Sequence, residues 1–154
     1  MIMRHALCLI AIFGLPLPLF AQQAPVATVS FDHVAISVEN VDRSADFYRT
    51  VFGLQEITNR TKVEGIRWLS LGEGKELHLV SVLKEPVSLN KAVHFALTTS
   101  DFDGLVENLR QADIEFSSWA GEAQAITIRA DNVRQIYLQD PDGYWIEVNS
   151  TASD

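Results

Sequence analysis

Cysteine is almost absent from this chain: the single one, Cys8, lies in an apolar stretch near the N-terminus. The rest of the chain therefore has no disulfide, no thiolate nucleophile and no cysteine ligand for a metal. Glycine motifs for phosphate binding are missing too, since the glycines of "LGEGKE" lack Walker-type or dinucleotide-binding spacing and suit a hairpin turn instead. No Gly-x-Ser-x-Gly motif occurs. These absences exclude a thiol enzyme, the common nucleotide-binding motifs and an esterase-type serine nucleophile.

Positive charge is also scarce, with 12 lysines and arginines against 20 aspartates and glutamates and a net charge of −8. No basic cluster reverses this balance locally. Such a surface repels nucleic acid and anionic membranes. We therefore expect a small-molecule substrate and no nucleic-acid partner.

The N-terminus is apolar but lacks a run long enough to span a membrane. After the basic start "MIMRH", the stretch "ALCLIAIFGLPLPLF" is shorter than the ~20 residues that a span needs and contains Pro16 and Pro18. Ala21 offers a small residue for cleavage, so residues 1–21 are predicted to be a secretory signal peptide. Cleavage would leave 133 residues with a net charge of −9, beginning with a flexible segment over 22–29. We expect an exported protein, periplasmic or secreted, without stable membrane association after cleavage.

What the chain does have is an internal repeat. The stretches "FDHVAISVEN" and "AVHFALTTSD" place His33 and His94 at the same point of two alternating strands. Further along, "WLSLGEGKELHLVS" aligns without gaps with "YLQDPDGYWIEVNS" at an offset of 69 residues, which pairs His78 with Glu147. Self-similarity of this kind indicates two copies of one structural unit.

Each half of the repeat predicts a strand, a helix and three further strands. The helices are expected in "VDRSADFYRTVFG" and "DFDGLVENLRQA", with Asp42 and Asp103 as N-caps and Gly53 as the left-handed end of the first. The fold class is therefore α+β: two βαβββ modules form a cupped, barrel-like mixed sheet with the helices on its outer face. The domain is expected over 30–150, with module 1 at about 30–84 and module 2 at about 91–150. The strands that follow the helices are expected at about 55–62, 65–71, 75–83, 123–130, 133–139 and 144–149.

Alternation along the strands predicts which side chains face the concave side of the sheet. Apolar residues of the last strand in each module are expected to pack under a helix, namely Leu77, Leu79, Ile146 and Val148. Their neighbours then point into the cup, and these include every histidine after the predicted signal peptide. The side chains expected to converge there are His33, His78, His94 and Glu147. Three imidazoles and a carboxylate suit a divalent transition metal, although any one of these histidines alone would more simply bond a backbone carbonyl.

Four more side chains share this face by the same alternation. Glu76 lies two residues before the second of these histidines and is expected beside the metal ligands. Trp68, Tyr137 and Trp145 are expected to line the cup and bind substrate, with simple core packing as the alternative.

The chain resembles the vicinal oxygen chelate superfamily in the stretches "DHVAISVENVDRSADFYRTVFGL", "VHFAL" and "IYLQDPDGYWIEV". The resemblance implies one divalent metal ion (zinc, nickel, iron or manganese) held in the cup by the four residues above. The glyoxalase I-like branch implies a lyase or isomerase that binds two neighbouring oxygens of a small substrate and polarises a carbonyl. Glu147, or Glu76 beside it, would move the proton. In glyoxalase I the position of His78 is usually glutamate, so the chain departs from that pattern.

Two other functions stay open. An extradiol-type dioxygenase is implied by "IYLQDPDGYWIE", which resembles the end of that group's signature, and its ligands would be His33, His94 and Glu147. His78 would then be an acid–base residue near the metal. A binding or resistance protein of the same superfamily would use the cup without chemistry. The sequence also leaves open whether the modules pair within one chain or are exchanged within a homodimer.

Overall fold

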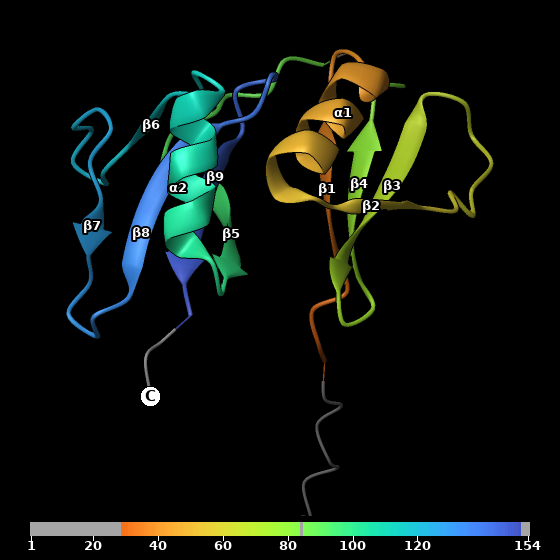
Figure 1. Cartoon of the computed structure of the whole chain (residues 1–154). Coiled ribbons are helices and arrows are strands. Elements are labelled where there is room, and N and C mark those ends of the chain that lie inside the picture. Colours follow the sequence, from red (N-terminus) through yellow and green to blue (C-terminus); the bar gives the residue numbers. More distant parts are fainter. Residues whose placement is uncertain (1–28, 84, 152–154) are drawn as a thin grey trace, which may run out of the picture. The chain divides into compact units, whose positions relative to one another are not determined.

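Two modules follow one another along the chain, as the repeat predicts: the first is βαβββ, and the second has the same order with one additional short strand, β7 (Figure 1). The computed structural model describes residues 29–83 and 85–151, so the predicted signal peptide lies outside the described residues. The first module contains β1 (His33–Ser37), α1 (Val41–Phe52), β2 (Gln55–Ile57), β3 (Ile66–Gly72) and β4 (Lys75–Val80). The second contains β5 (His94–Thr99), α2 (Phe102–Gln111), β6 (Phe116–Ser117), β7 (Thr127–Ile128), β8 (Arg134–Gln139) and β9 (Trp145–Ser150).

Each module forms its own mixed sheet, and the two sheets have the same topology. The strand orders are β1-β4-β3-β2 and β5-β9-β8-β6, with β7 paired to β8 outside this path. The first strand of each module is parallel to the last, while the remaining pairs are antiparallel. The α+β class is confirmed. The two sheets remain separate within the described residues, so they form an open arrangement and not a closed barrel.

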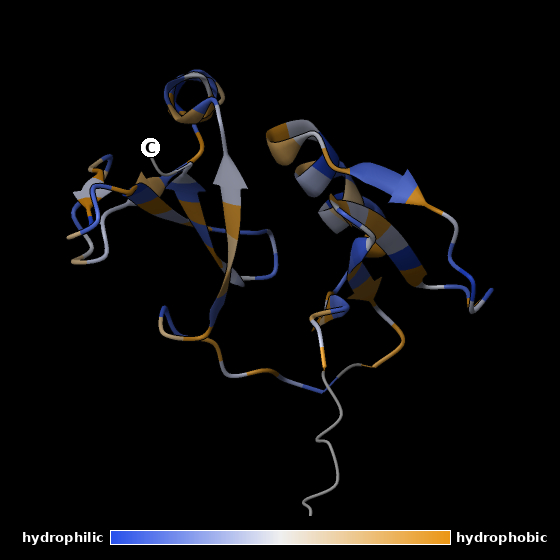
Figure 2. Ribbon diagram, turned by 90° about the horizontal axis from the view of Figure 1, so that it is seen from below, coloured by the Kyte–Doolittle hydropathy of each residue, from blue (hydrophilic) through white to orange (hydrophobic). Residues whose placement is uncertain are grey.

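The core lies between each sheet and its helix. Leu77 and Leu79 of β4 are fully buried, and so are Ile146 and Val148 of β9, as alternation predicts. Figure 2 shows hydrophobic and hydrophilic residues mixed along both helices, and the hydrophobic ones join the same core cluster. Each fully buried aliphatic side chain contributes about 1.5–3 kcal/mol relative to exposure. The apolar side chains of β4 and β9 are thereby used for packing, and the candidate polar residues of these strands lie on the opposite face.

The helix starts differ from the prediction. Asn40, not Asp42, caps α1, because its extended backbone lets its side chain accept from the amides of Asp42 and Arg43. Asp101, not Asp103, caps α2 and accepts from the amide of Gly104. The two predicted caps lie inside the first turn. The end of α1 at Gly53 is confirmed, with φ of 66° in the left-handed region that glycine adopts without strain.

Two predicted strands are also wrong. The strand expected over 55–62 ends at Ile57, because the Asn59 side chain donates to the carbonyls of Val63 and Ile66 and closes a turn instead. The strand expected over 123–130 is reduced to the two residues of β7. The edge position that matches β2 is taken by β6, which pairs with β8 soon after α2 ends.

The "DPDG" turn of the second module contacts the first helix of the first module. The hydroxyl of Tyr48 donates to Asp140 at 2.8 Å, and both residues are buried. Next to this bond, the Asp142 carboxylate accepts from the Ser44 hydroxyl at 2.6 Å and from Arg43 at 3.0 Å. These polar contacts join the modules and lie near the start of α1, where the helix dipole favours a carboxylate.

Within the described residues, no helix has both the length and the hydropathy that crossing a membrane requires.

Candidate functional site

The first group of candidate residues lies on the face of the β1-β4-β3-β2 sheet that points away from α1. In the register, His33 of β1 lies opposite Glu76 of β4, and Trp68 of β3 lies opposite His78 of β4. Because side chains alternate, all four share the face opposite the buried Leu77. We call His33, Glu76 and His78 the first half-site.

Planar groups stack in a column on this face. The Arg60 guanidinium lies 4.5 Å from the centre of the Trp68 ring, which stacks on His78 at 4.1 Å with an interplanar angle of 8°. His78 stacks in turn on His33 at 4.3 Å and 18°. Trp68 is buried, with 7% of its surface exposed, so the ring on which His78 stacks is held in place by packing. The column holds both imidazoles in fixed planes.

Carboxylates orient both imidazoles. His78 Nε2 lies 2.7 Å from Glu76 Oε2, and His33 Nδ1 lies 2.7 Å from Asp32 Oδ2. An ionised carboxylate only accepts, so each of these nitrogens carries the hydrogen. The lone pair of a neutral ring is then on His78 Nδ1 and on His33 Nε2. The hydrogen bond from His78, followed by the one from Arg60, lowers the pKa of Glu76, which keeps this carboxylate ionised at neutral pH.

The second group lies on the matching face of the second sheet. His94 of β5 and Glu147 of β9 point away from α2, and His94 Nε2 lies 3.0 Å from Glu147 Oε2. The other ring nitrogen, Nδ1, donates to the carbonyl of Lys91 at 2.7 Å. The His94 side chain is 23% exposed and that of Glu147 is 10% exposed. We call His94 and Glu147 the second half-site.

Glu147 is held by a network of hydrogen bonds. Its Oε2 accepts from the Tyr137 hydroxyl at 2.5 Å, and its Oε1 accepts from the Asn149 amide at 2.7 Å. Gln135 donates to the Tyr137 hydroxyl at 3.0 Å and fixes that group. Burial by itself raises the pKa of Glu147, but the hydrogen bonds from Tyr137 and Asn149, together with the charge of a protonated His94 and a contribution from Gln135, lower the pKa overall. The carboxylate is therefore ionised and oriented, as a metal ligand or a base must be.

The donor set of the second half-site fits a cation. The protonated His94 ring would donate from Nε2 to Glu147, whereas the neutral ring, with Nδ1 donating to a carbonyl, presents its Nε2 lone pair to an ionised carboxylate 3.0 Å away. A divalent ion that accepts both lone pairs would remove this repulsion, and imidazole nitrogen with carboxylate oxygen is a common ligand pair for transition metals. These two residues therefore offer a donor pair that suits the predicted metal.

The structure does not bring all four predicted ligands into one cluster. Over residues 29–83 and 85–151, no three His, Asp, Glu or Cys side chains converge closely enough to hold an ion. His33 and His78 are adjacent on one sheet, while His94 and Glu147 are adjacent on the other. The four predicted ligands thus lie in two separate pairs, one on each sheet.

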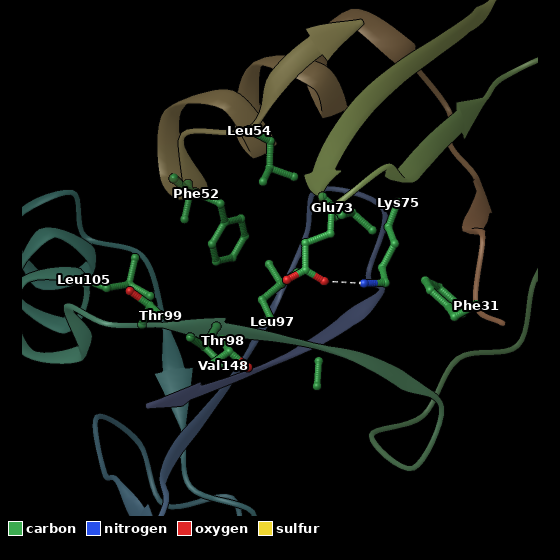
Figure 3. A pocket seen from close by; sticks show the side chains of 13 residues that line it. Phe31, Phe52, Leu54, Glu73, Lys75, Leu97, Thr98, Thr99, Leu105 and Val148 are labelled. Carbon is green, nitrogen blue, oxygen red and sulfur yellow. Dashed lines mark hydrogen bonds and ion pairs between the residues drawn. The ribbon is translucent and has the colours of Figure 1, made fainter. Parts of the chain in front are cut away.

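A cavity of about 660 Å³ lies elsewhere, between the tip of the β3–β4 hairpin and β5 (Figure 3). Its walls combine apolar side chains such as Phe52, Leu97 and Leu105 with polar ones, among them the ion pair of Glu73 and Lys75. None of the four predicted metal ligands lines it. The predicted ligands therefore lie outside this cavity, on the open polar faces of the sheets.

The aromatic residues predicted to bind substrate lie on these faces but are not equally accessible. Trp68 and Tyr137 are buried under their partners, whereas Trp145 is half-buried beside the Lys91 ammonium. Sequence reasoning missed several side chains that shape the half-sites: Asp32, Arg60, Lys91, Trp119, Gln135 and Asn149. Asn149 could have been found, since it lies two residues beyond Glu147 on the same strand face. Lys91 and Trp119 come from irregular segments, where alternation predicts nothing.

Known proteins resemble the chain over most of its length. Residues 30–148 match the family model described as the Glyoxalase/Bleomycin resistance protein/Dioxygenase superfamily. Glyoxylase I 4 of Arabidopsis thaliana is 28% identical over 133 residues, which cover 80% of this chain and 72% of that protein. Among solved structures, Oxidase ChaP-H2 superposes with a TM-score of 0.67 at 20% identity, over 80% of this chain and 94% of the other. Lactoylglutathione lyase from Agrobacterium tumefaciens does so with a TM-score of 0.61 at 18% identity, over 81% and 96%.

Proposed function

This chain belongs to the glyoxalase/bleomycin resistance protein/dioxygenase superfamily, and we propose that it is a metal-dependent lyase or isomerase of the glyoxalase-like branch. Its substrate would be a small molecule with two neighbouring oxygen atoms. The observation that carries the proposal is the pair of His94 Nε2 and Glu147 Oε2, 3.0 Å apart, with the histidine tautomer and the carboxylate both fixed by neighbours. The similarity to Glyoxylase I 4 also supports this branch.

The metal would be held by His33, His78, His94 and Glu147, with zinc, nickel, iron or manganese as the candidates. When bound, it would supply Lewis-acid polarisation of a substrate carbonyl, which lowers the cost of removing a neighbouring proton. Each half-site supplies two ligands, fewer than the four that a stable site commonly uses. We therefore propose that a second copy of the chain brings its second half-site to the first half-site of its partner, which makes the protein a homodimer.

The proton would be moved by the carboxylates of the half-sites. Glu76 and Glu147 both have a lowered pKa, so each is ionised at neutral pH and can accept a proton. Glu76 already contacts His78 Nε2, and a proton can pass between these two atoms without any movement of the sheet. Trp145, half-buried on the neighbouring sheet, offers a flat surface for the substrate.

An extradiol-type dioxygenase is the second candidate, and one observation favours it. His78 donates from Nε2 to the Glu76 carboxylate at 2.7 Å, so this pair would serve as the acid–base group beside a metal held by two histidines and one carboxylate, His33, His94 and Glu147. Such a set is associated with iron centres that keep open positions for oxygen and substrate. The structural similarity to Oxidase ChaP-H2 supports the fold alone and not this reaction.

Paired assays distinguish the two reactions. The proposal predicts isomerisation of an α-ketoaldehyde adduct without oxygen by zinc- or nickel-loaded protein, and no oxygen uptake with catechol. Oxygen uptake on catechol by iron-loaded protein, together with no anaerobic activity, would establish the dioxygenase instead. Glu76→Gln is expected to reduce the rate while metal content stays unchanged, because Glu76 orients His78 and is not itself a ligand.

We propose in addition that residues 1–21 direct export and are removed after Ala21, which gives a periplasmic or secreted protein. The support is the order of basic start, short apolar run and small residue. N-terminal sequencing of the protein from native cells tests this. A chain that starts at Met1 would contradict it.

A further inference from the structure

Lys91 lies beside the second half-site and contacts it with both its backbone and its side chain. Its carbonyl accepts from His94 Nδ1 at 2.7 Å. Its ammonium donates to the Ser117 hydroxyl at 3.1 Å and to the carbonyl of Ser118 at 3.0 Å, while the Trp119 carbonyl lies at 3.5 Å. The residue that sets the tautomer of His94 therefore also places a positive charge at the edge of the same face.

This charge has no carboxylate partner among the residues that the structure describes. All three acceptors of Lys91 are neutral oxygens, and no Asp or Glu oxygen lies within ion-pair distance of its ammonium. Arg60, the cation on the corresponding face of the first module, differs because it is paired with Glu76 at 2.8 Å. In a chain with a net charge of −8, an unneutralised ammonium beside a binding face is well placed to attract an anion.

Aromatic rings surround the ammonium. It lies 4.7 Å from the centre of the Trp145 ring and 5.5 Å from that of Tyr137, whose hydroxyl donates to Glu147. Trp119 is 51% exposed and lies 5.4 Å from the Tyr137 ring and 6.3 Å from the His94 ring. An exposed tryptophan with rings on two sides offers a flat apolar surface close to the cation.

A cavity adjoins this position, although Lys91 and Trp119 do not themselves line it. Ser117, Tyr137 and Trp145, which all contact Lys91, line a cavity of about 540 Å³. Its wall also includes Asp113 and Glu115, both on the exposed surface. Because these carboxylates repel an anion, a negatively charged group in the cavity would be directed toward Lys91.

We propose that Lys91 anchors the carboxylate of an aromatic acid whose ring packs against Trp119 and Trp145. This assignment of a substrate class rests on the proposed function, because the same face carries His94 and Glu147. A single ammonium on the sheet face that also carries the ionised Glu147 suits a monoanion such as a carboxylate. Tyr137 connects Lys91 with Glu147, because its ring contacts the Lys91 ammonium and its hydroxyl donates to Glu147.

Benzoate and its neutral analogue benzamide test the proposal by calorimetric titration of the purified protein, without metal and with zinc. The metal-free protein is expected to bind benzoate about tenfold or more tightly than benzamide, because the N–H group that has only the Trp119 carbonyl at 3.5 Å can turn to a carboxylate and form a charge-assisted hydrogen bond. Lys91→Met keeps the aliphatic stem on Trp145 and should abolish this preference while leaving benzamide binding unchanged. Lys91→Arg should retain the preference for benzoate, which would show that the loss in Lys91→Met comes from the missing charge and not from altered folding.

Lys75→Met is the matched control, because Lys75 is paired with Glu73 in the first module and lies outside this face. It should leave the benzoate preference intact. Equal affinities for the two compounds, no binding of benzoate by the wild-type protein, or a preference that survives Lys91→Met would each overturn the proposal. Zinc binding is measured in the same titrations, and its absence alongside an intact benzoate preference would contradict the metal-dependent function while leaving the role of Lys91 standing.

Discussion

At the scale of single residues, the buried bond between Tyr48 and Asp140 is the most consequential contact outside the half-sites. It joins α1 of the first module to the "DPDG" turn of the second, and neither residue is open to water. Removing a donor from such a pair leaves the other group buried without its partner, which costs more than the bond itself contributes.

Tyr48→Phe should therefore lower the free energy of unfolding by about 1–3 kcal/mol. Tyr144→Phe is the control, because the Tyr144 hydroxyl accepts from the backbone amide of Ser37 at a half-buried position that water can reach. Urea unfolding of both variants measures the difference. A loss for Tyr48→Phe no larger than that for Tyr144→Phe would show that the buried bond has no special weight.

The pH dependence of stability reports on Asp140. Burial raises its pKa, and the hydrogen bonds from Tyr48 and from the backbone amides of Tyr144 and Asp142 offset this only in part. The pKa of such a carboxyl is higher in the folded protein than the value of about 3.9 in the unfolded chain. Its contribution to stability is fully present below the unfolded pKa and is lost as the pH rises through the folded pKa.

Asp140→Asn removes this titration. The free energy of unfolding of the wild-type protein minus that of the variant should increase as the pH falls from about 7 to about 4. Urea unfolding across that range provides the measurement. Asp46→Asn, on the exposed side of α1, controls for the loss of a surface carboxylate. A difference that shrinks on acidification would mean that Asp140 is not destabilised by burial.

At the scale of the elements, the start of α1 shows what can be predicted about a helix from its sequence alone. Asn40 and Asp42 are both good capping residues by type. What decides between them is the backbone of Asn40, which is extended at φ −139° and ψ 111° and directs its side chain at the free amides of the first turn. Asp42 instead pairs with Arg67 across to β3.

Asn40→Ala should lower the free energy of unfolding by about 1 kcal/mol, as loss of an N-cap commonly does. Asp42→Ala should change it less, since its ion pair with Arg67 is exposed on the aspartate side and surface pairs contribute little. Thermal unfolding of the two variants side by side tests the assignment. The reverse order of effects would return the cap to Asp42.

At the scale of the whole molecule, the sequence predicts correctly which face of a sheet each side chain occupies, but it does not predict how far apart the side chains of the two sheets lie. The period of two along β4 and β9 correctly separates the buried Leu77 and Ile146 from His78 and Glu147. Whether the two sheets bring their polar faces together depends on contacts such as the one between Tyr48 and the "DPDG" turn, which no strand pattern encodes. The predicted cluster of four ligands was therefore right about the face of each residue but is present as two pairs.

Exchange of half-sites between chains makes a prediction about mixed dimers. His33→Ala damages the first half-site and His94→Ala the second. If a site forms between two chains, a mixed dimer of the two variants contains one site with all ligands intact, and mixing should restore zinc binding that neither variant shows alone. Refolding the two variants together and measuring zinc provides the test, with each variant refolded alone as the control. If mixing the variants does not restore zinc binding, the two half-sites that hold each ion would belong to one chain.

The central claim is that His33, His78, His94 and Glu147 hold a divalent ion, and metal content after zinc loading and desalting tests it most directly. The wild-type protein should retain one ion per chain, and Glu147→Gln should retain almost none, because the amide removes the charge that offsets the metal. Glu107→Gln, on the exposed side of α2, should bind as the wild type does. A wild-type protein that cannot be loaded, or a Glu147→Gln variant that binds zinc as tightly as the wild type, would contradict the account.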